Sequence, residues 1–273
     1  VSRGLDALNY VCYQDARFMI VGTPSGITLA PEGGAHQSIG SPLIGISQDG
    51  LAAFEPAFAD ELAIIMEWSF DYLQRDGSDD PDERTWLRDE TGGSVYLRLS
   101  TNPIEQPGKR IDDRFRQGTI DGAYWLREPG PNCEIVIAYQ GVIAPEAIKA
   151  AGIIGESRRD IGVLAVTSAD RLNAGWTAAQ RARAKGQTNA KSQIEILLGD
   201  IPSHSRLITV IDGHPATLAW LGSVIGHQTV PLGVEHFGQT GTIGDLYHHF
   251  GIDAQSIVEK VHGLTSGQPV ARF

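Results

Sequence analysis

The residues with the clearest chemical potential lie in one short loop, residues 30–41 (Ala-Pro-Glu-Gly-Gly-Ala-His-Gln-Ser-Ile-Gly-Ser). The loop combines an acid, two adjacent glycines and a single histidine, with almost no large apolar side chain. A tight Gly33-Gly34 backbone leading into His36 predicts an imidazole presented from a loop, where binding and catalytic groups tend to sit. Such an imidazole could bind an oxyanion or transfer a proton near neutral pH. An ordinary surface loop is the alternative interpretation.

The other candidate motifs are weaker. The sequence contains no Gly-rich phosphate loop followed by Lys-Ser/Thr, no His-Glu-x-x-His and no Gly-x-Ser-x-Gly elbow. Ser25 lies in a predicted Thr-Pro-Ser-Gly turn and has no identifiable acid–base partner. His248 and His249 would project about 100° apart on a helix, so they would not both face one metal ion. We therefore predict no metal site in this chain.

Composition limits the class of protein. With 273 residues and 41% hydrophobic content, the chain can bury one large core or two modest ones. A formal net charge of −11 argues against non-specific binding to nucleic acid or to anionic membranes. No apolar run approaches the roughly 18 residues of a membrane helix and no leader is visible, so we expect a soluble, cytoplasmic protein. The chain begins at Val1 without an initiator Met, so we expect that a preceding part has been removed.

The two cysteines, Cys12 and Cys133, lie far apart in the sequence. Their spacing suggests neither a disulfide framework nor a zinc site. We expect both to be buried free thiols.

Hydrophobic periodicity and turn residues predict two α/β units separated by a linker. The first unit, residues 1–100, has predicted helices at 1–14 and 57–73 and strands at 17–22, 51–54 and 94–99. The linker, 101–120, begins with a polar stretch that contains Pro103 and Pro107 and has no sustained periodicity. The second unit, 121–273, has predicted strands at 123–126, 133–138, 161–166, 206–211 and 229–234, and helices at 144–154, 169–183, 193–198, 216–224, 243–250 and 253–261.

This alternation predicts an α/β fold with mostly parallel sheets covered by helices on both faces, giving two three-layer α/β/α domains. The connection between the strands at 123–126 and 133–138 is too short for a crossover, so one of them must run antiparallel to its neighbour. Ser168 is a candidate N-cap for the predicted helix at 169–183.

Several motifs in the same order resemble transketolase-like thiamine diphosphate enzymes, most closely the homodimeric pyruvate dehydrogenase first component. Residues 32–37 (Glu-Gly-Gly-Ala-His-Gln) are similar to that family's His-Gln loop, and residues 54–61 (Phe-Glu-Pro-Ala-Phe-Ala-Asp-Glu) to its Tyr-Asp-Pro-Ala-Tyr-Ala-x-Glu segment. Residues 233–238, 246–250 and 252–254 resemble its Gly-x-Asp-Gly-Phe-Gly and Leu-x-His-His-Phe-x-Val-Asp-Ala motifs. The resemblance implies that 1–100 is the end of a pyrimidine-binding domain. It also implies that 121–273 is a transketolase C-terminal-like domain, a five-stranded sheet with one antiparallel edge strand.

The resemblance also implies a site. His36 would stand beside the thiazolium ring and contact the oxygen of a 2-oxo acid or of the covalent intermediate, with Glu32 and Gln37 near substrate or cofactor. The intact enzyme would bind thiamine diphosphate and Mg²⁺. However, the family's ylid-generating glutamate and its pyrimidine-stacking aromatic residue would precede Val1, and no Gly-Asp-Gly occurs here. We therefore expect that this chain lacks most of the cofactor site, does not bind the cofactor tightly alone and is inactive alone.

The substrate prediction depends on residues 99–106 (Leu-Ser-Thr-Asn-Pro-Ile-Glu-Gln). Transketolases carry Ser-Arg-Gln at this place, and the Arg grips a sugar phosphate; here no Arg follows Leu99. The resemblance therefore favours a 2-oxo acid, with pyruvate as the default. Transketolase is the alternative enzyme, because Arg98 could compensate if its strand faces the cleft.

The resemblance implies partners as well. A homodimer or an upstream segment would supply the diphosphate domain, and a lipoyl acyltransferase would accept the two-carbon unit. The helix at 57–73, with Trp68 and Phe70, is a natural subunit contact, although both residues could equally be core. A non-catalytic structural or dimerisation module is a further alternative. An unrelated α/β binding domain would require the ordered matches to be chance.

Overall fold

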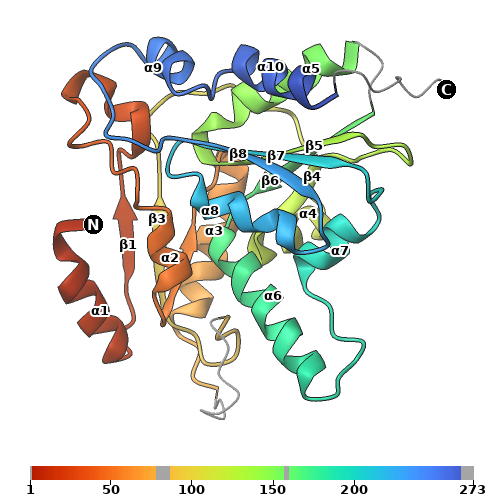
Figure 1. Cartoon of the computed structure of the whole chain (residues 1–273). Coiled ribbons are helices and arrows are strands. Elements are labelled where there is room, and N and C mark those ends of the chain that lie inside the picture. Colours follow the sequence, from red (N-terminus) through yellow and green to blue (C-terminus); the bar gives the residue numbers. More distant parts are fainter. Residues whose placement is uncertain (1, 78–86, 157–159, 266–273) are drawn as a thin grey trace.

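The computed structural model describes residues 2–77, 87–156 and 160–265 of the chain, and it contains two sheets (Figure 1). The sequence also predicts a solvated acidic loop at residues 76–83 (Asp-Gly-Ser-Asp-Asp-Pro-Asp-Glu), which lies largely outside these ranges. Among the described residues, no helix is long and apolar enough to cross a membrane. Cys12 and Cys133 are both free and buried, which confirms the expectation for them.

The first sheet is small and entirely parallel. It consists of β1 (Met19–Gly22), β2 (Leu51–Phe54) and β3 (Ser94–Arg98), in the order β1-β3-β2. Helix α3 (Ala59–Tyr72) packs on one face through an apolar cluster that includes Trp68. Helices α1 (Leu5–Tyr13) and α2 (Leu43–Ser47) pack on the other face. This unit is therefore a three-layer α/β/α arrangement, as predicted.

The second sheet has five strands in the order β4-β6-β5-β7-β8. The strands are β4 (Ala123–Arg127), β5 (Ile135–Gln140), β6 (Ile161–Val166), β7 (Arg206–Ile211) and β8 (Gln228–Leu232). The edge strand β4 runs antiparallel to β6, and the remaining neighbours are parallel. The predicted mixed sheet with one antiparallel edge strand is confirmed.

Helices cover both faces of this sheet because its central strands are apolar on both sides. Helices α5 (Ala144–Glu156), α9 (Ile243–His249) and α10 (Ala254–Thr265) share one apolar cluster with the sheet. Helices α6 (Ala169–Ala184), α7 (Gln193–Gly199) and α8 (Ala216–Ala219) share the other. Ser168 caps α6, since its Oγ accepts a hydrogen bond from the Arg171 backbone N–H at 3.0 Å.

The segment between the two sheets contains a helix that the sequence analysis did not predict, α4 (Asp113–Asp121). The Asp112 side chain caps its N-terminus, and Gly122 ends it with a left-handed φ of 109°. The helix buries only a narrow face around Phe115, which stacks edge-on against Tyr124 at 4.8 Å. So few apolar residues give a weak periodic signal, which explains why the helix was missed.

The two sheets are joined by hydrogen bonds between their strand ends and α6. The Glu55 backbone N–H donates to the Thr167 carbonyl at 2.7 Å. The Ser168 hydroxyl donates to the Ala53 carbonyl at 2.6 Å, and the Ala53 N–H donates to the Asp170 carboxylate at 2.9 Å. These contacts bring the carboxyl end of β2 next to the carboxyl end of β6 and the start of α6.

Candidate functional site

His36 lies at the tip of a loop that follows a 3₁₀ helix, η2 (Gly26–Glu32). Its side chain is exposed to solvent, and its backbone N–H closes a turn onto the Gly33 carbonyl at 3.2 Å. Two residues later, Ser38 adopts a left-handed φ of 50°, which is uncommon for a residue other than glycine. The loop thus has a defined backbone, and it presents an imidazole rather than burying it.

One side of the loop docks against residues 238–241, close to the C-terminal end of the chain. Gly34 and Gly238 form an antiparallel bridge, and the Gln37 side-chain amide donates to the Gln239 carbonyl at 3.0 Å. A Cβ on Gly34 would lie 1.9 Å from the Gly238 carbonyl oxygen, so only glycine permits this approach. Gly33 has a left-handed φ of 83°. The paired glycines are therefore explained by close backbone packing.

The other side of the loop rests on a buried polar cluster, made of Ser41, Glu55, Arg98, Gln140 and Asp212. Arg98 is 3% exposed and forms an ion pair with Glu55, which is 4% exposed. The remaining guanidinium nitrogens donate to the Ser41 hydroxyl at 2.9 Å and to the Asp212 carbonyl at 2.8 Å. The Gln140 amide donates to the second Glu55 oxygen at 2.8 Å. The cluster joins the carboxyl ends of both sheets.

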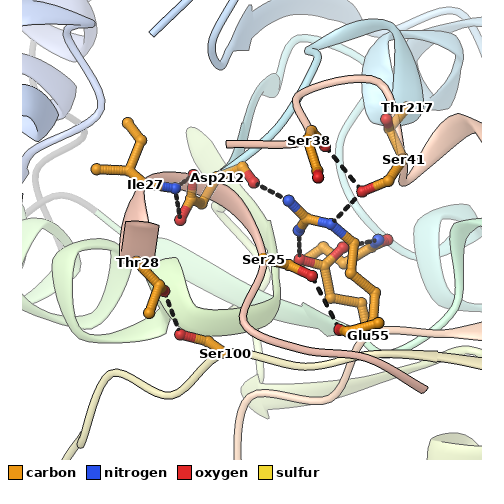
Figure 2. Close-up of polar contacts among 12 residues, drawn as sticks. Ser25, Ile27, Thr28, Ser38, Ser41, Glu55, Ser100, Asp212 and Thr217 are labelled. Carbon is orange, nitrogen blue, oxygen red and sulfur yellow. Dashed lines mark hydrogen bonds and ion pairs between the residues drawn. The ribbon is translucent and has the colours of Figure 1, made fainter. Parts of the chain in front are cut away.

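The cluster also holds the backbone of the His36 loop (Figure 2). The Asp212 carboxylate accepts the Ile27 N–H at 2.9 and 3.0 Å, at the start of η2. The Ser41 hydroxyl, which accepts from Arg98, donates to the Ser38 carbonyl at 2.8 Å. Figure 2 shows the dashed lines that join Ile27 to Asp212 and Ser38 to Ser41. The buried polar cluster is thus positioned to hold both ends of the loop.

Burial raises the pKa of both acids of the buried polar cluster, Glu55 and Asp212. It raises the pKa of Glu55 to about 7, against the opposing attraction of Arg98 and the hydrogen bond from Gln140. It raises the pKa of Asp212 to about 6, again against the attraction of Arg98. Acids with a strongly shifted pKa occur at functional sites and also in structural ion-pair networks. Because these acids are buried and hydrogen-bonded, the arrangement supports the loop instead of meeting a ligand.

The three residues predicted for the site differ in their exposure to solvent. His36 and Glu32 are exposed, whereas Gln37 is fully buried and serves to dock the loop. Arg98 is committed to Glu55 and does not face an open cleft, so the suggestion that it could grip a phosphate loses its structural support. Ser25 is buried and donates to the Gly22 carbonyl at 2.9 Å, which gives it no nucleophilic setting.

The sequence analysis missed the buried polar cluster. A signal was present, because each charged or amide member stands at or just after the end of a strand: Glu55 after β2, Arg98 in β3, Gln140 in β5 and Asp212 after β7. Ligand sites and polar clusters gather at the carboxyl ends of parallel strands. Among the described residues, no group of three or more His, Cys, Asp or Glu side chains could hold a metal ion.

The amino-acid sequence is similar to known enzymes over nearly its whole length. It is 27% identical over 262 residues to the pyruvate dehydrogenase E1 component of Mycolicibacterium smegmatis, covering 94% of this chain and 27% of the relative. It is 25% identical over 256 residues to the 6-deoxy-6-sulfo-D-fructose transketolase subunit of a Clostridium species, covering 93% of this chain and 67% of the relative. No protein-family model matches the chain.

Solved transketolase structures share this fold. A variant transketolase from Pichia stipitis matches with a TM-score of 0.69 at 17% identity, covering 99% of this chain and 34% of that one. A chain described as a split-gene transketolase, inactive β4 tetramer, matches with a TM-score of 0.62 at 16% identity, covering 96% of this chain and 71% of that one. The chain spans about a quarter of the pyruvate dehydrogenase relatives it matches, 27% and 26%.

Proposed function

We propose that this chain, a transketolase-like segment, supplies one side of the active site of a thiamine diphosphate-dependent 2-oxo acid dehydrogenase. One observation carries the proposal: His36 is exposed at the tip of a loop whose supporting contacts are buried. A loop built in this way holds one imidazole in place for a ligand bound outside this chain. The resemblance of residues 32–37 to the family's His-Gln loop supports the assignment.

In this proposal, His36 donates a hydrogen bond to the substrate oxygen or moves a proton there. Thiamine diphosphate, when bound, supplies the carbanion and the electron sink for decarboxylation. Glu32 is exposed in the same loop as His36, and we place it near the same ligand. The buried Gln37 keeps the loop docked. Since the described residues offer no cluster for a metal ion, Mg²⁺ and the diphosphate are assigned to another segment or chain.

The substrate is proposed to be a 2-oxo acid, with pyruvate as the first choice. Arg98, which the sequence offered as a replacement for the missing phosphate-gripping residue, is buried against Glu55. A lipoyl acyltransferase would accept the acyl unit. Transketolase activity is the second candidate, favoured by the transketolases among the relatives and structural neighbours.

The complete site is proposed to form with a homodimer partner or with a segment that carries the diphosphate domain. A relative named as a subunit and a neighbour named as a split-gene product support an arrangement in separate chains. Helix α3 is a candidate contact: Trp68 is buried in the core, but Phe70 is 55% exposed. A non-catalytic structural module would use the same surface without any role for His36.

The experiment that tests the proposal compares two histidine variants in the enzyme reconstituted with the segment that carries Gly-Asp-Gly. The assay measures pyruvate-dependent reduction of an artificial electron acceptor with thiamine diphosphate and Mg²⁺ present. His36→Ala should lower kcat by about a hundredfold, the usual contribution of a positioned acid–base group. His204→Ala, at another exposed histidine, should leave the rate unchanged. Equal rates for both variants would overturn the role of His36, and turnover of ketose phosphate alone would favour transketolase.

A further inference from the structure

A cavity of about 640 Å³, which no residue of the His36 loop lines, opens between residues 107–115, the edge strand β4 and helix α5. We name it the β4 pocket. Its size lies within the range of sites that enclose small organic ligands. Its floor is apolar, formed in part by Phe115, Leu126 and Ile148. Ile148, on the solvent-facing side of α5, is 37% exposed.

The rim of the β4 pocket carries positive charge on a protein whose net charge is −11. Four lining side chains are cationic and two are acidic. Lys109 is engaged by Asp60 at 2.9 Å, and Arg114 by Glu128 at 2.6 Å. Arg127 forms no ion pair with any described residue. The Arg127 guanidinium therefore borders the β4 pocket without a carboxylate partner among the residues that the structure describes.

An irregularity in β4 places this guanidinium at the pocket. The pairing of β4 with β6 shifts register between Trp125 and Arg127. In a regular strand, Leu126 and Arg127 would point to opposite faces. Here Leu126 packs with the apolar cluster on the α5 face, and the Arg127 guanidinium comes within 3.2 Å of the position a Cβ on Gly155 of α5 would occupy. Such bulges commonly redirect a side chain at a binding site.

We propose that the β4 pocket binds an amphipathic organic anion, a flat apolar body that carries one acidic group. The apolar body would lie on Phe115, Leu126 and Ile148, and the acidic group would pair with Arg127. A planar guanidinium suits carboxylate, sulfonate and phosphate oxygens alike. The pocket is independent of the proposed function, because no residue of the His36 loop or of the buried polar cluster lines it.

The probe is 8-anilino-1-naphthalenesulfonate, an aromatic body with one acidic group, titrated against the 273-residue chain and followed by fluorescence. Gly152 lines the pocket on α5, and a side chain added there meets nothing within 4 Å, so Gly152→Phe should fill the cavity. It should weaken binding by at least about tenfold. Gly263→Phe, at an equally open position on α10, is the matched control and should bind like the unmodified chain.

The charge is tested separately with Arg127→Gln. This variant should weaken the sulfonate probe by about fivefold and leave its neutral counterpart, N-phenyl-1-naphthylamine, unaffected. Should Gly152→Phe fail to fold, Ile148→Glu places a repelling charge on the apolar floor of the pocket and should likewise weaken binding of the sulfonate by at least about tenfold. The proposal is overturned if the pocket-filling variant or Ile148→Glu binds the probe as the control does. It is also overturned if Arg127→Gln weakens both probes equally.

Discussion

Replacing Arg98 with methionine removes the cation at the centre of the buried polar cluster while keeping an apolar side chain of similar length. The change deletes the ion pair with Glu55 and the hydrogen bonds to Ser41 and to the Asp212 carbonyl. Glu55 is 4% exposed, so it would be left as a buried charge without its cation. Breaking a buried pair in this way costs about 3–5 kcal/mol, a large share of the stability of an ordinary domain.

The assay is urea unfolding followed by circular dichroism, at pH 5 and at pH 8. Burial raises the pKa of Glu55 to about 7 even with Arg98 beside it, and removal of Arg98 raises this pKa further. The unpaired carboxyl is therefore neutral at pH 5, and the cost of burying it without its cation grows as the pH rises to 8. Arg98→Met should therefore destabilise less at pH 5 than at pH 8. The double variant Glu55→Gln/Arg98→Met should recover part of the loss, since no charge is left buried.

The matched control is Arg110→Met, at a side chain that is 90% exposed, and it should change stability by less than about 0.5 kcal/mol. The reasoning is refuted if Arg98→Met costs no more than Arg110→Met. It is also refuted if the loss at pH 5 equals or exceeds the loss at pH 8.

Two further predictions concern the loop and the joint between the sheets. Gly34→Ala should detach the His36 loop, because the added Cβ would meet the Gly238 carbonyl. Amide hydrogen exchange across residues 30–41 should then accelerate. The control Gly40→Ala, at a position with open space around it, should leave the exchange unchanged. Burial raises the pKa of Asp170 to about 7, so its stabilising contribution is complete below an unfolded pKa near 4 and is lost as pH rises through 7. Asp170→Asn should remove roughly 4 kcal/mol of the fall in unfolding free energy between pH 4 and pH 8, and an unchanged fall would contradict this burial effect.

The elements that the sequence predicted best are those with long apolar runs or clear caps. Strand β6 is buried along its whole length, and Ser168 caps the helix that follows, so both were visible in the sequence. The short connection after β4 predicted that one strand runs antiparallel, and the family resemblance placed the antiparallel strand at the edge. Helix α4 was missed because it buries little more than Phe115, Gly118 and Thr119.

The candidate site was only partly predictable. The Gly-Gly-x-His pattern located the loop, but the reason for Gly34 is a contact with Gly238, about 200 residues away, which no local pattern contains. In the same way, Glu55 and Asp212 belong to different sheets, and their shared cluster depends on how the sheets pack. Sequence patterns identify strand ends, whereas tertiary packing decides which ends meet.

The measurement that tests the central claim most directly is calorimetric titration of the chain with thiamine diphosphate and Mg²⁺, first alone and then mixed with the segment that carries Gly-Asp-Gly. If the chain supplies only the His36 side of the site, it should bind no cofactor alone, and micromolar binding should appear in the mixture. Micromolar affinity of the chain alone, or none in a mixture that forms a stable complex, would contradict the proposal.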